Sequence, residues 1–329
     1  MQPTLAAYPK HHKIMIDCNQ AIAALDWSKE PQGLYAPIAY ALSSGGKRLR
    51  MQLVLAGCRL VGGNEQDALP FAEAIEVFHN FTLLHDDVMD RAEVRRGMPT
   101  VHIKWNDNTA ILSGDQMLIE AYRLLEKVPD TYLPQLLHLF TKTATEICEG
   151  QQYDIDFEQR SDVQISDYIE MIRLKTSVLL AAALKGGAII GGATYGEQDA
   201  LYNYGIHLGL AFQIQDDLLD CFGDPATFGK AIGGDISCNK KTYLLLSALQ
   251  QADTHQREAL NSWLQLTAPS AEKIESVKAL YIATHAREAA EQAIANHTAE
   301  ALKCLSTLPD NSETRHLGQM ARNLAQRKS

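Results

Sequence analysis

Apolar residues recur at intervals of three or four positions along most of the chain, which is the spacing of one face of a helix. Phe71, Ile75 and Phe78 illustrate the pattern. It predicts long helices over the ranges Ala68–Asp90, Thr109–Lys127, Leu133–Phe157, Tyr168–Leu184, Ala200–Phe222, Lys240–Gln251, Ala271–Ala293 and His297–Leu305. Ser166 is the expected N-cap of the fourth helix. No segment shows strand alternation or a hairpin signal, so we expect an all-α fold in which long helices pack as a bundle.

Composition adds few constraints to this prediction. The chain has 329 residues, of which 46% are hydrophobic and 21% are charged, as in an ordinary globular protein. No linker rich in proline, serine or glycine divides it, so we expect a single domain over residues 1–329. The net charge of -10 argues against a nucleic-acid partner.

Several features indicate a soluble protein of the cytoplasm. The six cysteines show no CxxC spacing and are interpreted as free thiols of a reducing compartment. The most apolar stretch, residues 177–196, is interrupted by Lys185 and two glycine pairs, so it is expected to form core helices rather than a membrane span. The N-terminus lacks the apolar core of a signal peptide.

The same acidic pattern, DDxxD, occurs twice, at residues 86–90 and 216–220. Each copy directly follows an apolar stretch, so each is expected on a helix, where its first and last aspartates share a face. One copy alone could be a solvated surface, but two in core-like surroundings are unlikely to be. Carboxylates at this spacing repel each other unless a cation lies between them. Hard divalent cations such as Mg²⁺ take carboxylate and phosphate oxygens. Because no nucleotide-binding motif is present, the pattern indicates a site for a diphosphate that is not a nucleotide.

Basic residues gather near glycines at several points. The segment GGKRLR spans residues 45–50, and Arg95-Arg96-Gly97 follows the first acidic motif. Arginine matches phosphate oxygens with its planar fork, and glycine lets the backbone approach an anion closely. Each cluster alone would fit a solvated surface, whereas together they fit a second, metal-free diphosphate pocket.

Three lysines lie in related settings. Lys175 precedes Thr176 within an apolar helix, Lys230 follows the second acidic motif, and Lys240 lies just beyond Gly233-Gly234-Asp235. A lysine in such a setting usually extends its charged end to solvent. Proximity to the acidic motifs would favour a functional role instead.

These residues together resemble the trans-isoprenyl diphosphate synthases, the polyprenyl synthetase family. The resemblance runs from about Gly45 to Thr242 and rests on motifs in the family's order. These are GGKRLR, His79, DDVMD with the following RRGMPT, Gly114-Asp115, Gly150-Gln151 with Asp154, Lys175-Thr176, FQIQ with DDLLD, Lys230, and Asp235 to Thr242. It implies the isoprenoid synthase fold, a single-domain bundle of long helices around a central cavity.

The resemblance also implies site roles and a cofactor. Three Mg²⁺ ions, with Mn²⁺ as an alternative, would be bound through Asp86, Asp90 and Asp216, with Asp87, Asp217 and Asp220 as further or supporting ligands. The allylic diphosphate would be held by Arg95, Lys175, Lys230 and Lys240. Isopentenyl diphosphate would be held by Lys47, Arg50, His79 and Arg96. Thr176 and Gln213 would line the region where charge develops, so that Lys175, Thr176, Gln213 and Lys230 form the catalytic set.

The implied activity is a trans-prenyl transfer. Cations would stabilise the diphosphate leaving an allylic carbon, and the double bond of isopentenyl diphosphate would attack the resulting allylic cation. Water must be excluded to protect this cation. The resemblance also suggests a homodimer formed through long helices.

Two positions depart from the family pattern. Met51 replaces a common proline, and Cys238-Asn239 replaces an acidic residue and glycine before Lys240. Neither change removes an expected ligand, so we expect activity to be retained.

Product length is expected to depend on residues before Asp86. By the resemblance, the growing chain passes Phe81 and Thr82, with Phe78 one turn earlier, and a bulky Phe81 limits it. The prediction is a C15 or C20 product, farnesyl or geranylgeranyl diphosphate. If Phe81 is ordinary core, nothing about product length follows.

Three other functions fit these residues less well. A class I terpene cyclase would need neither the second DDxxD nor GGKRLR. A non-catalytic subunit of a heteromeric synthase typically loses aspartates, whereas all six are present here. A purely structural bundle would leave the clustered charges unexplained.

Overall fold

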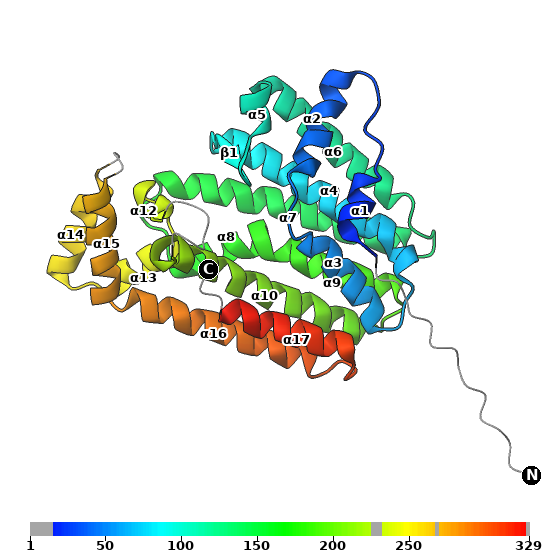
Figure 1. The fold of residues 1–329 in the computed structure, drawn as a ribbon. Helices are drawn as coiled ribbons and strands as arrows, with labels where there is room; N and C mark the ends of the chain where they lie inside the picture. Colours follow the sequence, from blue (N-terminus) through cyan, green and yellow to red (C-terminus); the bar gives the residue numbers. More distant parts are fainter. Residues whose placement is uncertain (1–15, 225–231, 267–269, 327–329) are drawn as a thin grey trace, which may run out of the picture. The chain divides into compact units, whose positions relative to one another are not determined.

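The computed structural model describes residues 16–224, 232–266 and 270–326 (Figure 1). The described chain is mostly helical, which confirms the predicted all-α class. It divides into two compact units. The first contains residues 16–48 and 77–118, and the second contains residues 49–76 and the described residues from 119 onward. The single domain over residues 1–329 stays a prediction.

The first unit combines short helices with one small hairpin. Its elements are α1 (Cys18–Ala23), α2 (Gln32–Ser43), the second half of α4 (Glu65–Met89), β1 (Val94–Arg95), β2 (Met98–Pro99), α5 (Val101–Lys104) and the first part of α6 (Asp107–Leu125). The strands are antiparallel, with Val94 opposite Pro99. Arg96 and Gly97 between them have φ of 52° and 78°. Positive φ at both central residues is typical of the type I′ turn. The expectation that no hairpin would occur was therefore wrong here, because two-residue strands are too short to show alternation.

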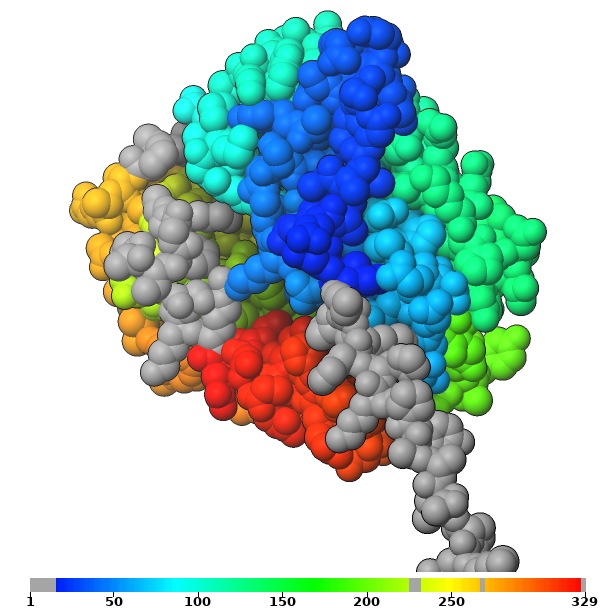
Figure 2. Space-filling view, turned by 45° about the vertical axis from the view of Figure 1, so that its right-hand side comes forward, coloured from blue at the N-terminus to red at the C-terminus, as the bar shows by residue number. Residues whose placement is uncertain are grey.

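The second unit contains the two longest helices, α7 (Leu133–Gln159) and α10 (Tyr195–Phe222). Its other helices include α3 (Leu49–Leu60), α8 (Ile165–Ile172), α9 (Val178–Ile190), α12 (Gly234–Ser237), α13 (Tyr243–Gln251), α14 (Thr254–Leu264), α15 (Ala271–Ala283), α16 (Ala286–Leu305) and α17 (Ser312–Ala325). Helix α10 packs against both α9 and α16, and α3 packs against α9 (Figure 1). Helix α17 packs on α16, and the two helices form the red and orange surface in Figure 2. None of the described helices is both long and apolar enough to cross a membrane.

A π-helical turn, η1 (Arg173–Ser177), separates α8 from α9. Two glycines allow neighbouring helices to pack closely against it. A Cβ atom at Gly150 of α7 would overlap the backbone of Lys175, and one at Gly209 of α10 would lie 2.5 Å from Cα of Ser177. The turn is therefore held between α7 and α10. Single π-turns of this kind are frequent at functional sites.

Two helix predictions were wrong in detail. The expected continuous helix from Tyr168 to Leu184 is interrupted by η1, which apolar periodicity does not reveal. Its N-cap is Gln164 rather than Ser166, and the Gln164 backbone N–H donates to the Asp167 carboxylate at 3.0 Å. The expected helix Ala271–Ala293 breaks earlier, at His285, whose φ is 56°.

Candidate active site

The first acidic motif lies at the C-terminal end of α4, in the first unit. The Asp90 N–H donates to the Asp86 carbonyl at 2.8 Å, so helical geometry continues through Asp90. The carboxylates of Asp86 and Asp90 therefore project from one face, as predicted. Asp86 is half-buried and Asp90 is exposed. Both positions allow a carboxylate to reach a solvated cation.

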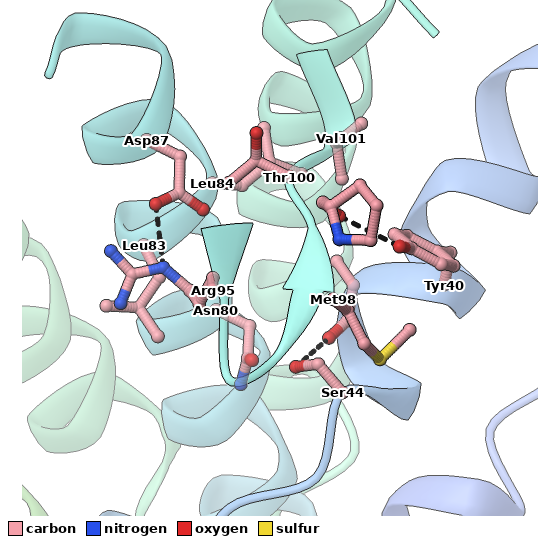
Figure 3. Close-up of a pocket in the computed structure, with 12 residues that line it drawn as sticks. Tyr40, Ser44, Asn80, Leu83, Leu84, Asp87, Arg95, Met98, Thr100 and Val101 are labelled. Atoms are coloured by element: carbon pink, nitrogen blue, oxygen red, sulfur yellow. Dashed lines mark hydrogen bonds and ion pairs between the residues drawn. The ribbon is translucent and has the colours of Figure 1, made fainter. Parts of the chain in front are cut away.

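Asp87 differs from its two neighbours in the motif. It is 6% exposed, and Nε of Arg95 donates to its Oδ1 at 2.7 Å (Figure 3). Burial raises the pKa of Asp87, and the Arg95 guanidinium only partly offsets this increase. Asp87 is thus already bonded within the protein, and it holds Arg95 of the hairpin beside α4.

A small cavity adjoins the Asp87–Arg95 pair (Figure 3). Its volume is about 30 Å³, which is room for a water molecule or two and not for a prenyl chain. Asn80 of α4 and Ser44 contribute to its wall. Asn80 is 3% exposed and did not stand out in the sequence. A polar residue amid apolar helix positions was the signal that could have revealed it.

The two basic segments of the first unit meet. The Arg96 guanidinium donates to the Gly45 carbonyl and, at 3.4 Å, to Oγ of Ser44. Gly46 has a φ of 122°, a conformation that other residues rarely adopt, so glycine is needed there. Lys47 is exposed, whereas Arg48 is buried and donates to the Leu42 carbonyl at 2.6 Å. Of these basic residues, Lys47 and Arg96 are exposed and Arg48 supports the loop, while an anion-binding role for Lys47 and Arg96 stays a prediction.

The other predicted residues for isopentenyl diphosphate lie on two helices. His79 is half-buried on α4, in the first unit. Arg50 is the second residue of α3 and belongs to the second unit. Their common role with Lys47 and Arg96 stays a prediction.

The predicted chain-length residues form part of an aromatic column on α4. The Phe81 ring lies 5.5 Å from the Phe78 ring and 4.8 Å from the His85 ring, between centroids. Phe78 is 2% exposed. The Thr82 hydroxyl donates to the His79 carbonyl at 2.8 Å. Phe81 is therefore held in place from both sides along its own helix.

The second acidic motif lies near the C-terminal end of α10, in the second unit. Asp216 and Asp220 are half-buried, whereas Asp217 is 6% exposed. The Tyr168 hydroxyl donates to Oδ2 of Asp217 at 2.5 Å, and the Gln213 amide donates to Oδ1 at 3.1 Å. Burial raises the pKa of Asp217 to about 6, although these two hydrogen bonds oppose the increase. Tyr168 is a site residue that the sequence did not reveal, because tyrosine on an apolar face is usually core.

Thr176 and Asp235 extend this network. The Thr176 hydroxyl donates to Oε1 of Gln213 at 3.2 Å, so these two residues lie together, and their expected catalytic role stays a prediction. The Asp235 N–H donates to Oδ2 of Asp220 at 3.0 Å. Burial raises the pKa of Asp235 to about 8, and the charges of Asp217 and Asp220 add to the increase. Carboxyl groups are thus concentrated at this end of α10, and burial with mutual repulsion opposes the ionisation of Asp217 and Asp235.

Two predicted lysines converge on one carboxylate. Nζ of Lys175 lies 2.7 Å from Oδ2 of Asp154, and Nζ of Lys240 lies 3.7 Å from the same atom. Burial raises the pKa of Asp154, but the two ammonium groups outweigh burial and hold the pKa below its usual value. Asp154 thereby positions both cations. Lys230 lies outside the described residues.

The donor set fits hard divalent cations. No group of three or more carboxylate, histidine or cysteine side chains in the described residues forms a ready-made metal cage. Each motif instead offers two partly accessible carboxylates, Asp86 with Asp90 and Asp216 with Asp220. Mg²⁺ typically binds one or two carboxylates and completes its shell with water and phosphate oxygens. Open pairs of carboxylates suit that mode of binding.

A helical fold that carries two such motifs with cations beside them is typical of the isoprenoid synthases, enzymes that act on prenyl diphosphates. Residues 31–283 match the polyprenyl synthetase family. The chain belongs to this family and is a prenyltransferase.

Two curated relatives illustrate the range of products in the family. The geranylgeranyl diphosphate synthase of Methanosarcina mazei is 44% identical over 223 residues, which cover 67% of this chain and 69% of that protein. The geranylfarnesyl diphosphate synthase of Natronomonas pharaonis is 40% identical over 254 residues, which cover 71% of this chain and 74% of that protein.

Solved structures agree with the fold. The geranylgeranyl pyrophosphate synthetase of Pyrococcus horikoshii superposes with a TM-score of 0.89 at 33% identity, covering 94% of each chain. A polyprenyl synthase of Caulobacter crescentus, solved with calcium and isoprenyl diphosphate, gives a TM-score of 0.85 at 29% identity and covers 94% of each chain. That relative therefore binds a divalent cation.

Proposed function

We propose that this protein condenses isopentenyl diphosphate with an allylic diphosphate and makes C20 geranylgeranyl diphosphate. The observation that carries the proposal is the second-unit network, in which Lys175 and Lys240 share Asp154 while Thr176 joins Gln213 and Asp217. A metal-dependent diphosphate site needs carboxylates and cations held in this way. The complete first motif and the similarity to the Methanosarcina synthase add support.

In this proposal the aspartate motifs bind Mg²⁺. Asp86, Asp90, Asp216 and Asp220 offer accessible oxygens, whereas Asp87 and Asp217 support the motifs from buried positions. When bound, Mg²⁺ neutralises the charge that develops on the leaving diphosphate.

The side chains of this protein act on both substrates. Arg95, Lys175, Lys230 and Lys240 hold the allylic diphosphate, and its C–O bond breaks as charge passes to the diphosphate oxygens. Lys47, Arg50, His79 and Arg96 hold isopentenyl diphosphate, whose double bond attacks the allylic carbon. A proton is then lost to the released diphosphate. Thr176 and Gln213 present an oxygen-bearing dipole to the cation while apolar walls exclude water.

Phe81 is proposed to limit the product. Its ring is held between Phe78 and His85, so it resists displacement by a growing chain. Phe81→Ala is expected to lengthen the longest product beyond C20, as sized by chromatography. Thr82→Ala removes far less volume from the same stretch of α4, so it should lengthen the product less than Phe81→Ala does. An unchanged product from Phe81→Ala would show that this ring is ordinary core, and C15 or C25 from the wild type would correct the length.

We further propose a homodimer. Helix α6 carries three exposed apolar residues, Ile111, Leu112 and Ile119, with exposed fractions of 45%, 59% and 54%. Leu112 and Ile119 are seven positions apart and share a face. Sedimentation equilibrium tests this proposal, and a monomer at micromolar concentration would refute it.

We expect the protein in the cytoplasm.

The decisive experiment is a product assay. Purified chain is incubated with Mg²⁺, isopentenyl diphosphate and each of dimethylallyl, geranyl and farnesyl diphosphate. A C20 product supports the proposal. Absence of condensation with every starter would indicate a subunit that needs a partner, and cyclised hydrocarbons would indicate a terpene cyclase.

A further inference from the structure

The turn that presents Lys240 has a specific backbone geometry. It begins at the end of α12, where Asn239 has a φ of 55°. The Asn239 N–H donates to the Ile236 carbonyl at 3.2 Å, and the Lys240 N–H donates to the Asp235 carbonyl at 2.9 Å. This pair of hydrogen bonds is the Schellman motif, which requires a left-handed residue at the position of Asn239. Asparagine accepts that conformation better than most residues.

Two side chains tie this turn to its neighbours: Asn239 of the turn bonds to α14, and Lys273 of α15 bonds to the end of α12. Nδ2 of Asn239 donates to the Leu264 carbonyl at 2.9 Å. Nζ of Lys273 donates to the Leu266 carbonyl at 2.7 Å and to the Ser237 carbonyl at 3.3 Å. Lys273 is only 1% exposed. The Ser237 carbonyl ends α12 and would otherwise lack a helical partner. Lys273 therefore satisfies the C-terminus of α12 and ties it to the end of α14.

The other end of the segment is bonded to the second acidic motif. The Gly233 N–H donates to the Asp220 carbonyl at 2.7 Å, and the Asp235 N–H donates to the Asp220 carboxylate at 3.0 Å. The segment thus links Asp220 to Lys240 over few residues. A shift of its braced end would move a predicted metal ligand and a predicted diphosphate ligand together.

We propose that Asn239 and Lys273 are positioning residues that fix Lys240 and the Asp220 carboxylate for binding of the metal–diphosphate complex. The inference rests on the proposed function for the identity of the substrate. The inference explains how asparagine at position 239 can replace the glycine that is common in the family. Asparagine keeps the left-handed backbone conformation, and its side-chain amide adds an anchoring hydrogen bond. Both residues act through backbone carbonyl groups, to which their side chains donate.

Substitutions at Asn239 separate conformation from anchoring. Asn239→Ala loses both, Asn239→Gly keeps the left-handed conformation, and Lys273→Met removes only the second anchor. We expect the KM for the allylic diphosphate to rise roughly tenfold in Asn239→Ala and about threefold in the other two, with the KM for isopentenyl diphosphate unchanged. The Mg²⁺ concentration for half-maximal activity is expected to rise in the same order.

His285 offers a matched control. It also has a left-handed backbone, with a φ of 56°, at the junction of α15 and α16. His285→Ala should lower the melting temperature, by less than Asn239→Ala because no anchoring hydrogen bond is lost, while leaving both KM values and the Mg²⁺ requirement unchanged. If the Asn239 and Lys273 variants likewise lose only thermal stability, their role is structural and the inference is wrong.

A binding measurement distinguishes this inference from the proposed function. Mg²⁺ with inorganic diphosphate should raise the melting temperature of the wild type more than that of Asn239→Ala. If the wild type makes no prenyl product but this difference persists, the proposed function fails and the positioning role stands. If Mg²⁺ with diphosphate stabilises both proteins equally, the positioning role is overturned, and failure to stabilise either one overturns both ideas.

Discussion

The two acidic motifs share one sequence pattern but differ in what surrounds the second aspartate. Asp87 and Asp217 are each 6% exposed. Asp87 accepts a hydrogen bond from a permanent cation, Arg95. Asp217 accepts hydrogen bonds from the neutral groups of Tyr168 and Gln213, and the charge of Lys240 also lowers its pKa, by less than these hydrogen bonds do. The buried aspartate of the first motif is thus hydrogen-bonded to a cation, whereas that of the second is hydrogen-bonded to dipoles and is influenced by a cation to a smaller extent.

This difference gives the motifs different dependence on metal. Burial raises the pKa of both aspartates, but Arg95 opposes the increase at Asp87, whereas the pKa of Asp217 reaches about 6. Ionising Asp217 is therefore costly until a cation arrives. We infer that the second motif is the one whose charge state is coupled more strongly to metal binding.

The largest effect is expected where the motifs are alike. Asp86→Asn and Asp216→Asn each remove a carboxylate that is accessible to a metal ion. We expect each to lower kcat/KM by roughly a hundredfold to a thousandfold, because charge stabilisation on the leaving diphosphate is lost. Steady-state kinetics at saturating Mg²⁺ measures this. A loss of less than tenfold in either variant would show that the two motifs do not contribute equally to metal binding.

A smaller effect should distinguish the two residues that hydrogen-bond the buried aspartates, Tyr168 at Asp217 and Arg95 at Asp87. Tyr168→Phe removes the hydroxyl donor to Asp217, and we expect the Mg²⁺ concentration for half-maximal activity to rise about tenfold. Arg95→Gln should instead act mainly on the KM for the allylic diphosphate, since Arg95 is also proposed to bind it. Titrating activity with Mg²⁺ at fixed substrate distinguishes the variants. If both variants change the Mg²⁺ requirement equally, the contrast between the motifs is wrong.

Neutralising the two buried aspartates is expected to change stability by different amounts. In metal-free protein at pH 8, Asp87→Asn relieves a buried charge but also takes the carboxylate away from Arg95, so its melting temperature should change by only about a degree. Asp217→Asn relieves a buried charge while Tyr168 keeps an oxygen acceptor, so its melting temperature should rise by roughly a few degrees. Thermal unfolding with EDTA present tests the pair. A similar loss in both would mean that the dipoles around Asp217 compensate its charge fully.

Helices in which apolar residues recur at intervals of three or four positions could be predicted from the sequence. The helix of Asp86 and that of Asp216 follow long apolar stretches, and both were found with their aspartates on the expected faces. The face that Asp86 and Asp90 share depends on local spacing, which a sequence displays directly. The convergence of Lys175 and Lys240 on Asp154 is a tertiary contact, and the expected common role of the two lysines stays a prediction.

What was missed depends on tertiary contacts. The π-turn at Arg173–Ser177 is held by close packing against Gly150 and Gly209, and apolar periodicity passes through it unchanged. Tyr168 has the pattern of a core residue until the structure places its hydroxyl against Asp217. The hairpin at Arg95 rests on two left-handed residues, Arg96 and Gly97, of which only the glycine signals a turn. At such positions the local structure depends on a tertiary contact, and the sequence does not show which residue makes it.

The smallest predicted effect is a pH dependence of stability that only the second motif should show strongly. The pKa of Asp217 is about 6 in the folded protein, against an ordinary value of 3.8. Between these values the folded state binds more protons than the unfolded state, so metal-free protein loses stability as the pH rises from about 4 to about 6. Asp217→Asn should lack this component, and the difference in melting temperature between this variant and the wild type should widen over that interval. Asp87→Asn should keep the component, because Asp217 is intact. Unfolding curves recorded with EDTA at several pH values measure the difference, and a gap that stays constant from pH 4 to pH 6 would show that the charge of Asp217 is already compensated without metal.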